Sequence, residues 1–384
     1  MTQPTSPTVD LVAGARPNFM KLAPVVRALS ARNRLRFRIV HTGQHYDEAM
    51  NEVFFTELGI PAPDVHLEVG SGSHGAQTAR ILERYEAHIN QNRPDATIVF
   101  GDVNSTVACA LAAVKLGVPV AHVEAGLRSF DRTMPEEINR LLTDAISGLL
   151  LVTEQSGLDN LRREGVSEEK IRLVGNVMID TLQSYLPEAR SRQAARRLGL
   201  SPKEYGVITL HRPSNVDDPA TLVDLVKTLR AFSEKMPLVF AVHPRTRASA
   251  ERAGIGDLLQ PGQPRFICVG PQPYVENLSL VADSAVVFTD SGGLQEETSV
   301  LGVPCVTMRD NTERPVTIEV GTSRLVGNDV DRLRAAFCDV LAGNWRTSRE
   351  IPLWDGHAGD RVADELATWL GAHTVLPSPA LVQH

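Results

Sequence analysis

The sequence lacks any apolar stretch that approaches the ~20 residues needed to span a bilayer, so we do not expect a membrane protein. Its start, "MTQPTSPTVD", has no basic region followed by an apolar segment, which argues against a signal peptide. The cysteines are few, far apart and without metal-ligand or redox spacing: Cys109, Cys268, Cys305 and Cys338. Reduced thiols of this kind fit the cytoplasm, where we expect the protein to act.

Several cofactor signatures are also missing. There is no Walker motif, no G-x-G-x-x-G, no D-x-D and no His or Cys cluster with ligand spacing. We therefore expect neither a metal ion nor an organic cofactor, and we expect arginines and helix ends to hold any diphosphate. The net charge of −7 and the pI of about 5.9 argue against a general affinity for nucleic acid, whose binding surfaces are strongly basic.

What is present is a repeated alternation of strand and helix patterns. Short β-branched runs such as "ATIVFGD" and "AVVFTD" alternate with longer helical segments, which is typical of an α/β fold with parallel sheets. A chain of 384 residues suggests two domains. The region "NVMIDTLQSYLPEARSRQAARRLG" is the least strand-like, so we expect domains over residues 1–176 and 177–356. A C-terminal helix and tail over 357–384 could pack on either domain, including back on the first.

Five polar residues directly follow predicted strands: Asp102, Glu124, His211, His243 and Asp290. Ligands of open parallel sheets bind beyond the carboxyl ends of the strands, so these are the residues to examine. For each residue alone, a role in capping a helix or making a turn explains the position equally well. All five at strand ends together indicate a binding edge.

Asp102 and Glu124 flank one predicted strand–helix–strand unit, "FGDVNSTVACALAAVKLGVPVAHVEAG". Its two strands are expected to be neighbours about 4.8 Å apart, which brings both carboxylates to one rim of the sheet. Two carboxylates in a cleft suit general acid and base work. The alternative is that one of them only caps the following helix.

The segment "TDSGGLQEE" predicts a strand, a turn of small residues and a helix whose free N–H groups can take a phosphate. Glu296 and Glu297 in that helix could accept hydrogen bonds from sugar hydroxyls. A second anion site is expected at "AGARPN", with Gly14 and Arg16 in the turn. Arg212 is the other arginine expected at a diphosphate.

The segment "HVEAGLRSFDRTMPEEINR" gathers acids and arginines within 19 residues, so it is either a solvated charged face or a reaction site. With the motifs "GARPNFMKLAPV", "TGQHYDEAM", "TLHRPSNVD", "VHPRTR" and "RDNTERP", it closely resembles the non-hydrolysing UDP-N-acetylglucosamine 2-epimerases. The resemblance covers nearly the whole chain. It implies two Rossmann-like domains of GT-B type, with the active site in the interdomain cleft, and a homodimer.

The resemblance also assigns roles to residues. It implies that the first domain carries the catalytic groups Asp102, Glu124 and Glu136, with His211 as the catalytic-site histidine. The second domain would bind UDP. The expected substrate-binding residues, of which the first belongs to the first domain, are Arg16, Arg212, His243, Ser291, Gly292, Gly293 and Glu297, the last on the ribose hydroxyls.

The implied reaction removes the C2 proton and expels UDP to give a 2-acetamidoglucal, and then re-adds UDP. A modified UDP-sugar of the 2,3-diacetamido uronic acid type is the main alternative substrate. A GT-B glycosyltransferase and a non-catalytic UDP-sugar sensor are two further hypotheses for the same fold. Asn277 stands where the family commonly has an aromatic residue against uracil. Gln44 is followed by Asp47 where many members have a second glutamine, so activation by a second substrate molecule is expected to be weak or absent.

Overall fold

The computed structural model describes residues 6–43, 55 and 57–373. The chain forms two compact units, Met1–Thr181 with Pro352–His384, and Leu182–Ile351. The division between them falls inside helix α7 (Val177–Arg192) and just before the final helical segment. The prediction from the sequence puts these boundaries at residues 176 and 356.

The first unit is built on a seven-stranded parallel sheet with the strand order β3-β2-β1-β4-β5-β6-β7. The two central strands that lead to the predicted carboxylates are buried at every residue, as expected for a parallel sheet covered on both faces. The strands are β1 (Thr8–Ala13), β2 (Arg36–His41), β3 (Val65–His66), β4 (Ala96–Phe100), β5 (Val120–Ala125), β6 (Leu149–Val152) and β7 (Ile171–Leu173).

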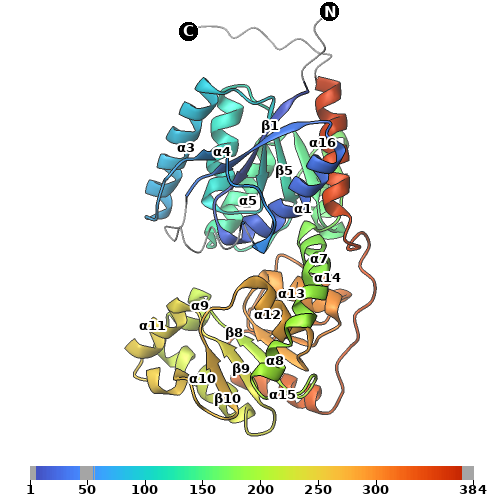
Figure 1. The fold of residues 1–384 in the computed structure, drawn as a ribbon. Coiled ribbons are helices and arrows are strands. Elements are labelled where there is room, and N and C mark those ends of the chain that lie inside the picture. The colour runs from blue at the N-terminus through green and yellow to red at the C-terminus, as the bar shows by residue number, and fades with distance from the viewer. Residues whose placement is uncertain (1–5, 44–54, 56, 374–384) are drawn as a thin grey trace, which may run out of the picture. The chain divides into compact units, whose positions relative to one another are not determined.

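Helices connect these strands, and the last helix of the chain returns to the first unit. Figure 1 shows α16 (Ala358–His373) beside α1, and Arg32 of α1 contacts Asp360 and Asp364 of α16 at 2.5 and 2.7 Å. The other segments of this unit are α1 (Arg16–Arg32), α3 (His74–Gln91), α4 (Asn104–Lys115), α5 (Pro135–Ile146), α6 (Gln155–Arg163) and a 3-10 turn at Glu168–Lys170.

The second unit has a six-stranded parallel sheet with the order β10-β9-β8-β11-β12-β13. Its strands are β8 (Gly206–Thr209), β9 (Leu238–Ala241), β10 (Phe266–Val269), β11 (Val286–Thr289), β12 (Cys305–Thr307) and β13 (Ser323–Leu325). Its helical segments are α8 (Ala194–Arg197), α9 (Pro213–Val216), α10 (Pro219–Phe232), α11 (Pro244–Arg252), Gly256–Leu259, α12 (Tyr274–Ala282), α13 (Gly292–Leu301), α14 (Val316–Glu319) and α15 (Val330–Leu341).

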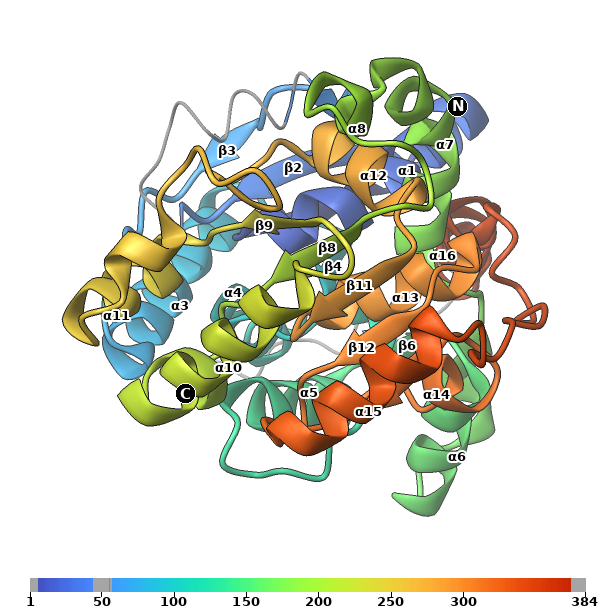
Figure 2. The same cartoon turned by 90° about the horizontal axis from the view of Figure 1, so that it is seen from below.

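Helices cover both faces of this second sheet. In Figure 2, α10 and α15 lie on one face of the strands and α12 and α13 on the other. The residues divide in the same way, because Phe232 and Phe337 pack on Phe288 in one buried cluster whereas Leu280 and Leu294 pack on Val287 in another. Within the described residues, no helix has the length and apolar character to cross a membrane.

Both sheets reverse their strand order once, between β1 and β4 in the first unit and between β8 and β11 in the second. In doubly wound sheets, the connections on the two sides of such a point run to opposite faces, which leaves a crevice beyond the carboxyl ends of the strands. The turns that follow these four strands are therefore where each unit should bind a ligand. The α/β fold class expected from the sequence is confirmed.

Candidate active site

Asp102 lies just beyond β4, on the crevice side of the first sheet. The turn that presents it begins at Gly101, whose φ of +63° is a left-handed conformation that glycine adopts without strain. Two residues of α5 hold Asp102: the Arg140 guanidinium forms an ion pair with its carboxylate, and Asn139 donates to its backbone carbonyl at 2.8 Å. The carboxylate therefore has a fixed direction and is still about a quarter exposed.

Glu124 lies at the end of the neighbouring strand β5. Its φ is +76°, a strained value for a residue with a side chain, and the pairing of β5 with β6 shifts register at this point. The carboxylate is buried and forms an ion pair with Lys21 of α1. A Cβ atom placed on Gly101 would meet the Lys21 ammonium at 2.5 Å, so the Asp102 turn and the Glu124 ion pair adjoin. The expectation that the two strands are neighbours is confirmed.

The two adjacent glutamates at the start of α5 have different surroundings. Glu137 is buried and accepts hydrogen bonds from the backbone N–H groups of Ser129 and Phe130 at 2.9 and 3.0 Å, and Arg140 lies 2.6 Å from it. Burial opposes its ionisation, but these bonds and the arginine lower the pKa of Glu137 below its usual value. Glu136 is half-buried and makes no hydrogen bond or ion pair with any described residue. Glu137 is thus part of the scaffold, whereas Glu136 is open to a ligand.

In the second unit, Asp290 follows β11 and holds the end of β8. It has no exposed surface, and it accepts from the backbone N–H groups of His211 and Arg212 at 3.0 and 2.9 Å and from Asn215 at 3.1 Å. The Nδ1 atom of His211 lies 2.9 Å from the same carboxylate. Burial works against ionisation of Asp290, yet His211 and these N–H groups lower its pKa. The bond through Nδ1 leaves the other ring nitrogen of His211 for a ligand.

Helix α13 begins in the next turn, with Ser291 at its N-cap and Gly292 as its first residue. The first N–H groups of a helix have no partner within it and attract an anion. A Cβ atom on Gly292 would lie 2.9 Å from Nη1 of Arg314, which places a guanidinium against this helix end. Arg314 is itself held by Glu296 at 2.5 Å and by Glu313. Gly293 and the buried Glu297 belong to the first two turns of the same helix.

The remaining predicted residues differ in how firmly the structure places them. Arg212 is half-buried, and its Nε donates to the backbone carbonyl of Asp290 at 3.0 Å. His243 is exposed, caps α11 by accepting from the Arg245 N–H group at 3.2 Å, and lies with its ring centroid 5.6 Å from that of His211. The side chain of Arg16 lies outside the described residues, as do Gln44 and Asp47.

The structure thus gathers Asp102 and Glu124 at one edge, and His211, Arg212 and the start of α13 at another. Three cations that were not among the predicted site residues complete these edges: Lys21, Arg140 and Arg314. Each lies inside a quoted motif, and that was the available signal. Among the described side chains, no group of three or more His, Cys, Asp or Glu is arranged to hold a metal ion.

Comparison with known proteins agrees with these two edges. The family model of UDP-N-acetylglucosamine 2-epimerase matches residues 27–367. A protein of Methanocaldococcus jannaschii with that name is 41% identical over 361 residues, which is 92% of this chain and 97% of the other. The chain belongs to the UDP-N-acetylglucosamine 2-epimerase family. Members of this family are UDP-sugar epimerases, an isomerase class, so the enzyme class expected from the resemblance is confirmed.

Other relatives widen the picture. A UDP-2,3-diacetamido-2,3-dideoxy-D-glucuronate 2-epimerase of Pseudomonas aeruginosa is 41% identical over 367 residues, 93% of this chain and 98% of that one. The crystal structure of the M. jannaschii epimerase with UDP-GlcNAc and UDP matches with a TM-score of 0.86 at 40% identity, covering 94% of this chain and 99% of that one. The Neisseria meningitidis epimerase bound to UDP-GlcNAc also gives 0.86, at 28% identity, covering 94% and 100%. The GT-B type of the fold is thereby confirmed.

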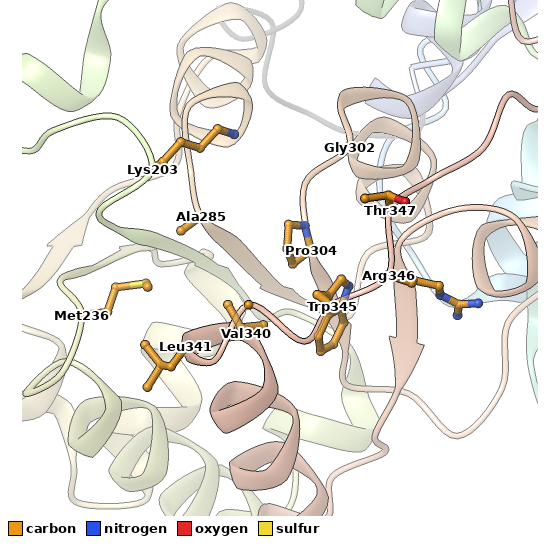
Figure 3. Close-up of a pocket in the computed structure, with 11 residues that line it drawn as sticks. Lys203, Met236, Ala285, Gly302, Pro304, Val340, Leu341, Trp345, Arg346 and Thr347 are labelled. Atoms are coloured by element: carbon orange, nitrogen blue, oxygen red, sulfur yellow. The ribbon is translucent and has the colours of Figure 1, made fainter.

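A hollow of about 420 Å³ lies elsewhere in the second unit (Figure 3). Ala285 and Pro304 line it just before β11 and β12, so it is at the amino edge of the sheet, away from the residues above. Its two cations are already bonded to backbone carbonyls, Lys203 to those of Ala282 and Ser284 and Arg346 to that of Ser323. None of the predicted site residues lines it.

Proposed function

We propose that the protein is a non-hydrolysing 2-epimerase that interconverts UDP-N-acetylglucosamine and UDP-N-acetylmannosamine, and that it supplies surface polysaccharide synthesis. The observation that carries the proposal is the pair Asp102 and Glu124, two carboxylates at the ends of neighbouring strands, each with its own cation. A protein that only binds a nucleotide sugar has no need for two such groups beside the sugar.

The proposal assigns the diphosphate to the second unit. The start of α13 offers N–H groups, Arg314 offers a guanidinium against Gly292, and Arg212 lies beside Asp290. Positive groups fixed in advance stabilise the charge that develops on a departing diphosphate without reorganising during the reaction. On sequence grounds alone, Arg16 is assigned to the same group.

The sugar ring is assigned to the carboxylates of the first unit. The C2 hydrogen has no adjacent ring carbonyl to acidify it, so departure of UDP must lead and positive charge develops near C1. The buried Glu124 carboxylate stabilises that charge. Asp102, ion-paired with Arg140, serves as the base at C2, and Glu136, which has no described partner, carries the proton for the opposite face. His211 uses its second nitrogen to hydrogen-bond the leaving diphosphate.

A second substrate is favoured by a specific finding, because the relative named for UDP-2,3-diacetamido-2,3-dideoxy-D-glucuronate is as similar as the relative named for UDP-N-acetylglucosamine. The same carboxylates and the same anion site serve both reactions. A 2,3-diacetamido uronic acid derivative of UDP is therefore the second candidate.

Proton NMR in D₂O tests the proposal, with UDP-N-acetylglucosamine and the diacetamido uronic acid analogue in parallel. Deuterium entering C2 of the first sugar, together with anomeric signals of the manno epimer, supports the first candidate. Exchange only in the analogue favours the second. Binding of both sugars without exchange at C2 would contradict an epimerase of either kind.

Homodimerisation stays a prediction from the resemblance. Sedimentation equilibrium of the purified protein at several concentrations tests it, since a dimer has twice the mass of the 41.8 kDa chain.

A further inference from the structure

The turn that presents Asp102 is held by side chains at three consecutive backbone carbonyls. Asn18 and Thr106 both donate to the carbonyl of Phe100 at 2.8 Å. Asn139 donates to that of Asp102 at 2.8 Å. The carbonyl between them, that of Gly101, lies 2.8 Å from Nε2 of His122, a residue in the middle of β5. Such repeated bonding of one turn is what fixing the direction of a reacting side chain requires.

His122 is an unusual residue for its position. It is completely buried in β5 between apolar neighbours, where a hydrophobic side chain is the ordinary choice. Its Nδ1 atom lies 2.6 Å from the carboxylate of Asp144, and its Nε2 atom meets the carbonyl of Gly101. A backbone carbonyl and an ionised carboxylate only accept hydrogen bonds, so a doubly protonated ring satisfies both contacts.

Asp144 is equipped to hold a cationic ring. Its second oxygen accepts from the N–H group of Gly126 at 3.0 Å and from Arg128 at 2.7 Å. Burial disfavours its charge, but His122 and Arg128 outweigh burial and lower the pKa of Asp144 below the usual value. Arg128 continues the series with two bonds to Glu164, at 2.8 and 2.7 Å. The charges alternate along this row, so none of them is buried without a partner.

We propose that His122 is a positioning residue for the epimerase reaction, which orients Asp102 by donating to the carbonyl of Gly101. This inference rests on the proposed function, since it supposes that Asp102 acts on the substrate. The Gly101 carbonyl belongs to the peptide group that leads into Asp102, so its direction sets the direction of the side chain that follows. Gly101 and Glu124, with positive φ of +63° and +76°, lie at the two ends of this arrangement.

Two conservative variants separate the two bonds of the ring. The amide nitrogen of glutamine reaches the place of Nε2, whereas that of asparagine reaches only the place of Nδ1. His122→Gln therefore keeps the donor to Gly101, and His122→Asn keeps only the contact with Asp144. We expect kcat for C2 deuterium exchange to fall about 100-fold in His122→Asn and less than about 10-fold in His122→Gln, with KM and the Kd for UDP within about 3-fold of wild type.

His88 provides the matched control. It is another buried histidine of the first unit and lies 3.1 Å from a buried acid, Asp10, but it contacts neither Gly101 nor Asp102. His88→Gln is expected to lower the thermal midpoint at most and to leave kcat within about 2-fold. If kcat falls equally in His88→Gln and His122→Asn at equal loss of stability, His122 is only structural and the inference is overturned.

A double variant gives the sharper test. If His122 acts through Asp102, adding His122→Asn to Asp102→Asn costs less than about 3-fold, far below its effect on the wild type. Multiplying effects would overturn the inference, as would a folded His122→Asn with unchanged kcat or an asparagine variant more active than the glutamine variant. Failure of the proposed function is distinguishable, because it shows as no C2 exchange in the wild-type protein.

Discussion

The two units carry an aspartate at the same place in the same topology and use it differently. Asp102 follows β4 and Asp290 follows β11, and each of these strands is the first beyond the point where the strand order reverses. Asp290 has no exposed surface and is surrounded by donors from His211, Arg212 and Asn215. Asp102 is paired with Arg140 and remains partly exposed. An acid at a strand end is thus a scaffold where donors saturate it and a reacting group where they do not.

The cations of the two edges differ as well. In the first unit, Lys21 and Arg140 each hold a predicted catalytic carboxylate. In the second, Arg314 is held by two glutamates and lies against the first residue of α13, where it adds to the positive helix end. One edge therefore presents acids with cations behind them, and the other presents cations with acids behind them. The first arrangement suits proton transfer and the second suits an anionic leaving group.

The comparison is tested most strongly by Asp102→Asn and Asp290→Asn. We expect Asp102→Asn to lower kcat about 1000-fold, since general base catalysis is typically worth 10² to 10⁴-fold, and to leave the Kd for UDP within about 3-fold. Asp290→Asn leaves buried N–H groups with a poorer acceptor, so it should lower stability by about 2 to 4 kcal/mol. Deuterium exchange at C2, UDP calorimetry and urea unfolding measure the three quantities. The reverse pattern, with Asp102→Asn unfolding the protein and Asp290→Asn only slowing turnover, contradicts the assignment.

A second pair of variants compares the glycines of the two edges. In Gly101→Ala the new Cβ is strained by the positive φ and meets the Lys21 ammonium at 2.5 Å, so we expect a loss of about 1 to 2 kcal/mol of stability. In Gly292→Ala the Cβ meets only the ends of Arg314 and Glu313, and alanine favours the helix. Its stability should stay within about 0.5 kcal/mol while UDP binds several-fold more weakly. Equal urea midpoints for both variants would remove this distinction.

Much of the fold could be predicted because it depends on local pattern. Buried parallel strands are continuous apolar runs, as in Ala96–Phe100, and their alternation with helices leaves few topologies. The neighbourhood of Asp102 and Glu124 also followed from the sequence, because a strand–helix–strand unit normally brings its two strand ends to one edge. These predictions required no knowledge of how helices pack.

The partners of those residues could not be predicted, because packing between distant elements sets them. His122 has no paired spacing in the sequence, yet it lies between Gly101 and Asp144, each more than 20 residues away. Helix α5 misleads a pattern argument further. It buries charged residues such as Glu137 and Arg140 and exposes Ile138 and Leu142, the reverse of an ordinary amphipathic helix, because its inner face supports Asp102. Local rules fail most often at functional sites.

Arg314→Lys tests the anion edge with a smaller effect. Lysine keeps the charge but cannot bridge Glu296 and Glu313 while facing Gly292, because only a guanidinium offers donors in a planar fork. We expect UDP to bind about 10-fold more weakly by calorimetry, and kcat at saturating substrate to change less than about 3-fold. Arg324→Lys, which changes an arginine paired with Asp339 elsewhere in this unit, is the control and should leave UDP binding unchanged.

The smallest expected effect concerns acid stability and separates two ways of holding an acid in the second unit. The pKa of Glu313 is kept well below its usual value, against the effect of burial, by Arg314 and Arg309, whereas that of Asp290 is lowered, also against burial, by His211 first. A carboxyl whose pKa is lower in the folded state contributes stability above its ordinary pKa and loses that contribution as the pH falls through the folded value. The urea midpoint of the wild type should therefore fall below about pH 4.

His211→Gln moves the pKa of Asp290 back towards its ordinary value and so removes part of that acid dependence. Because one proton over one pH unit corresponds to about 1.4 kcal/mol, and the His211 ring is 41% exposed and screened by water, the difference between variant and wild type should be well below that figure. Urea midpoints measured from pH 6 to pH 3 supply the comparison. The variant should keep the part of the acid dependence that comes from Glu313, whose arginines do not titrate in this range. An acid dependence identical to that of the wild type would mean that the backbone N–H groups alone hold Asp290 ionised, and that the histidine is free for the leaving group.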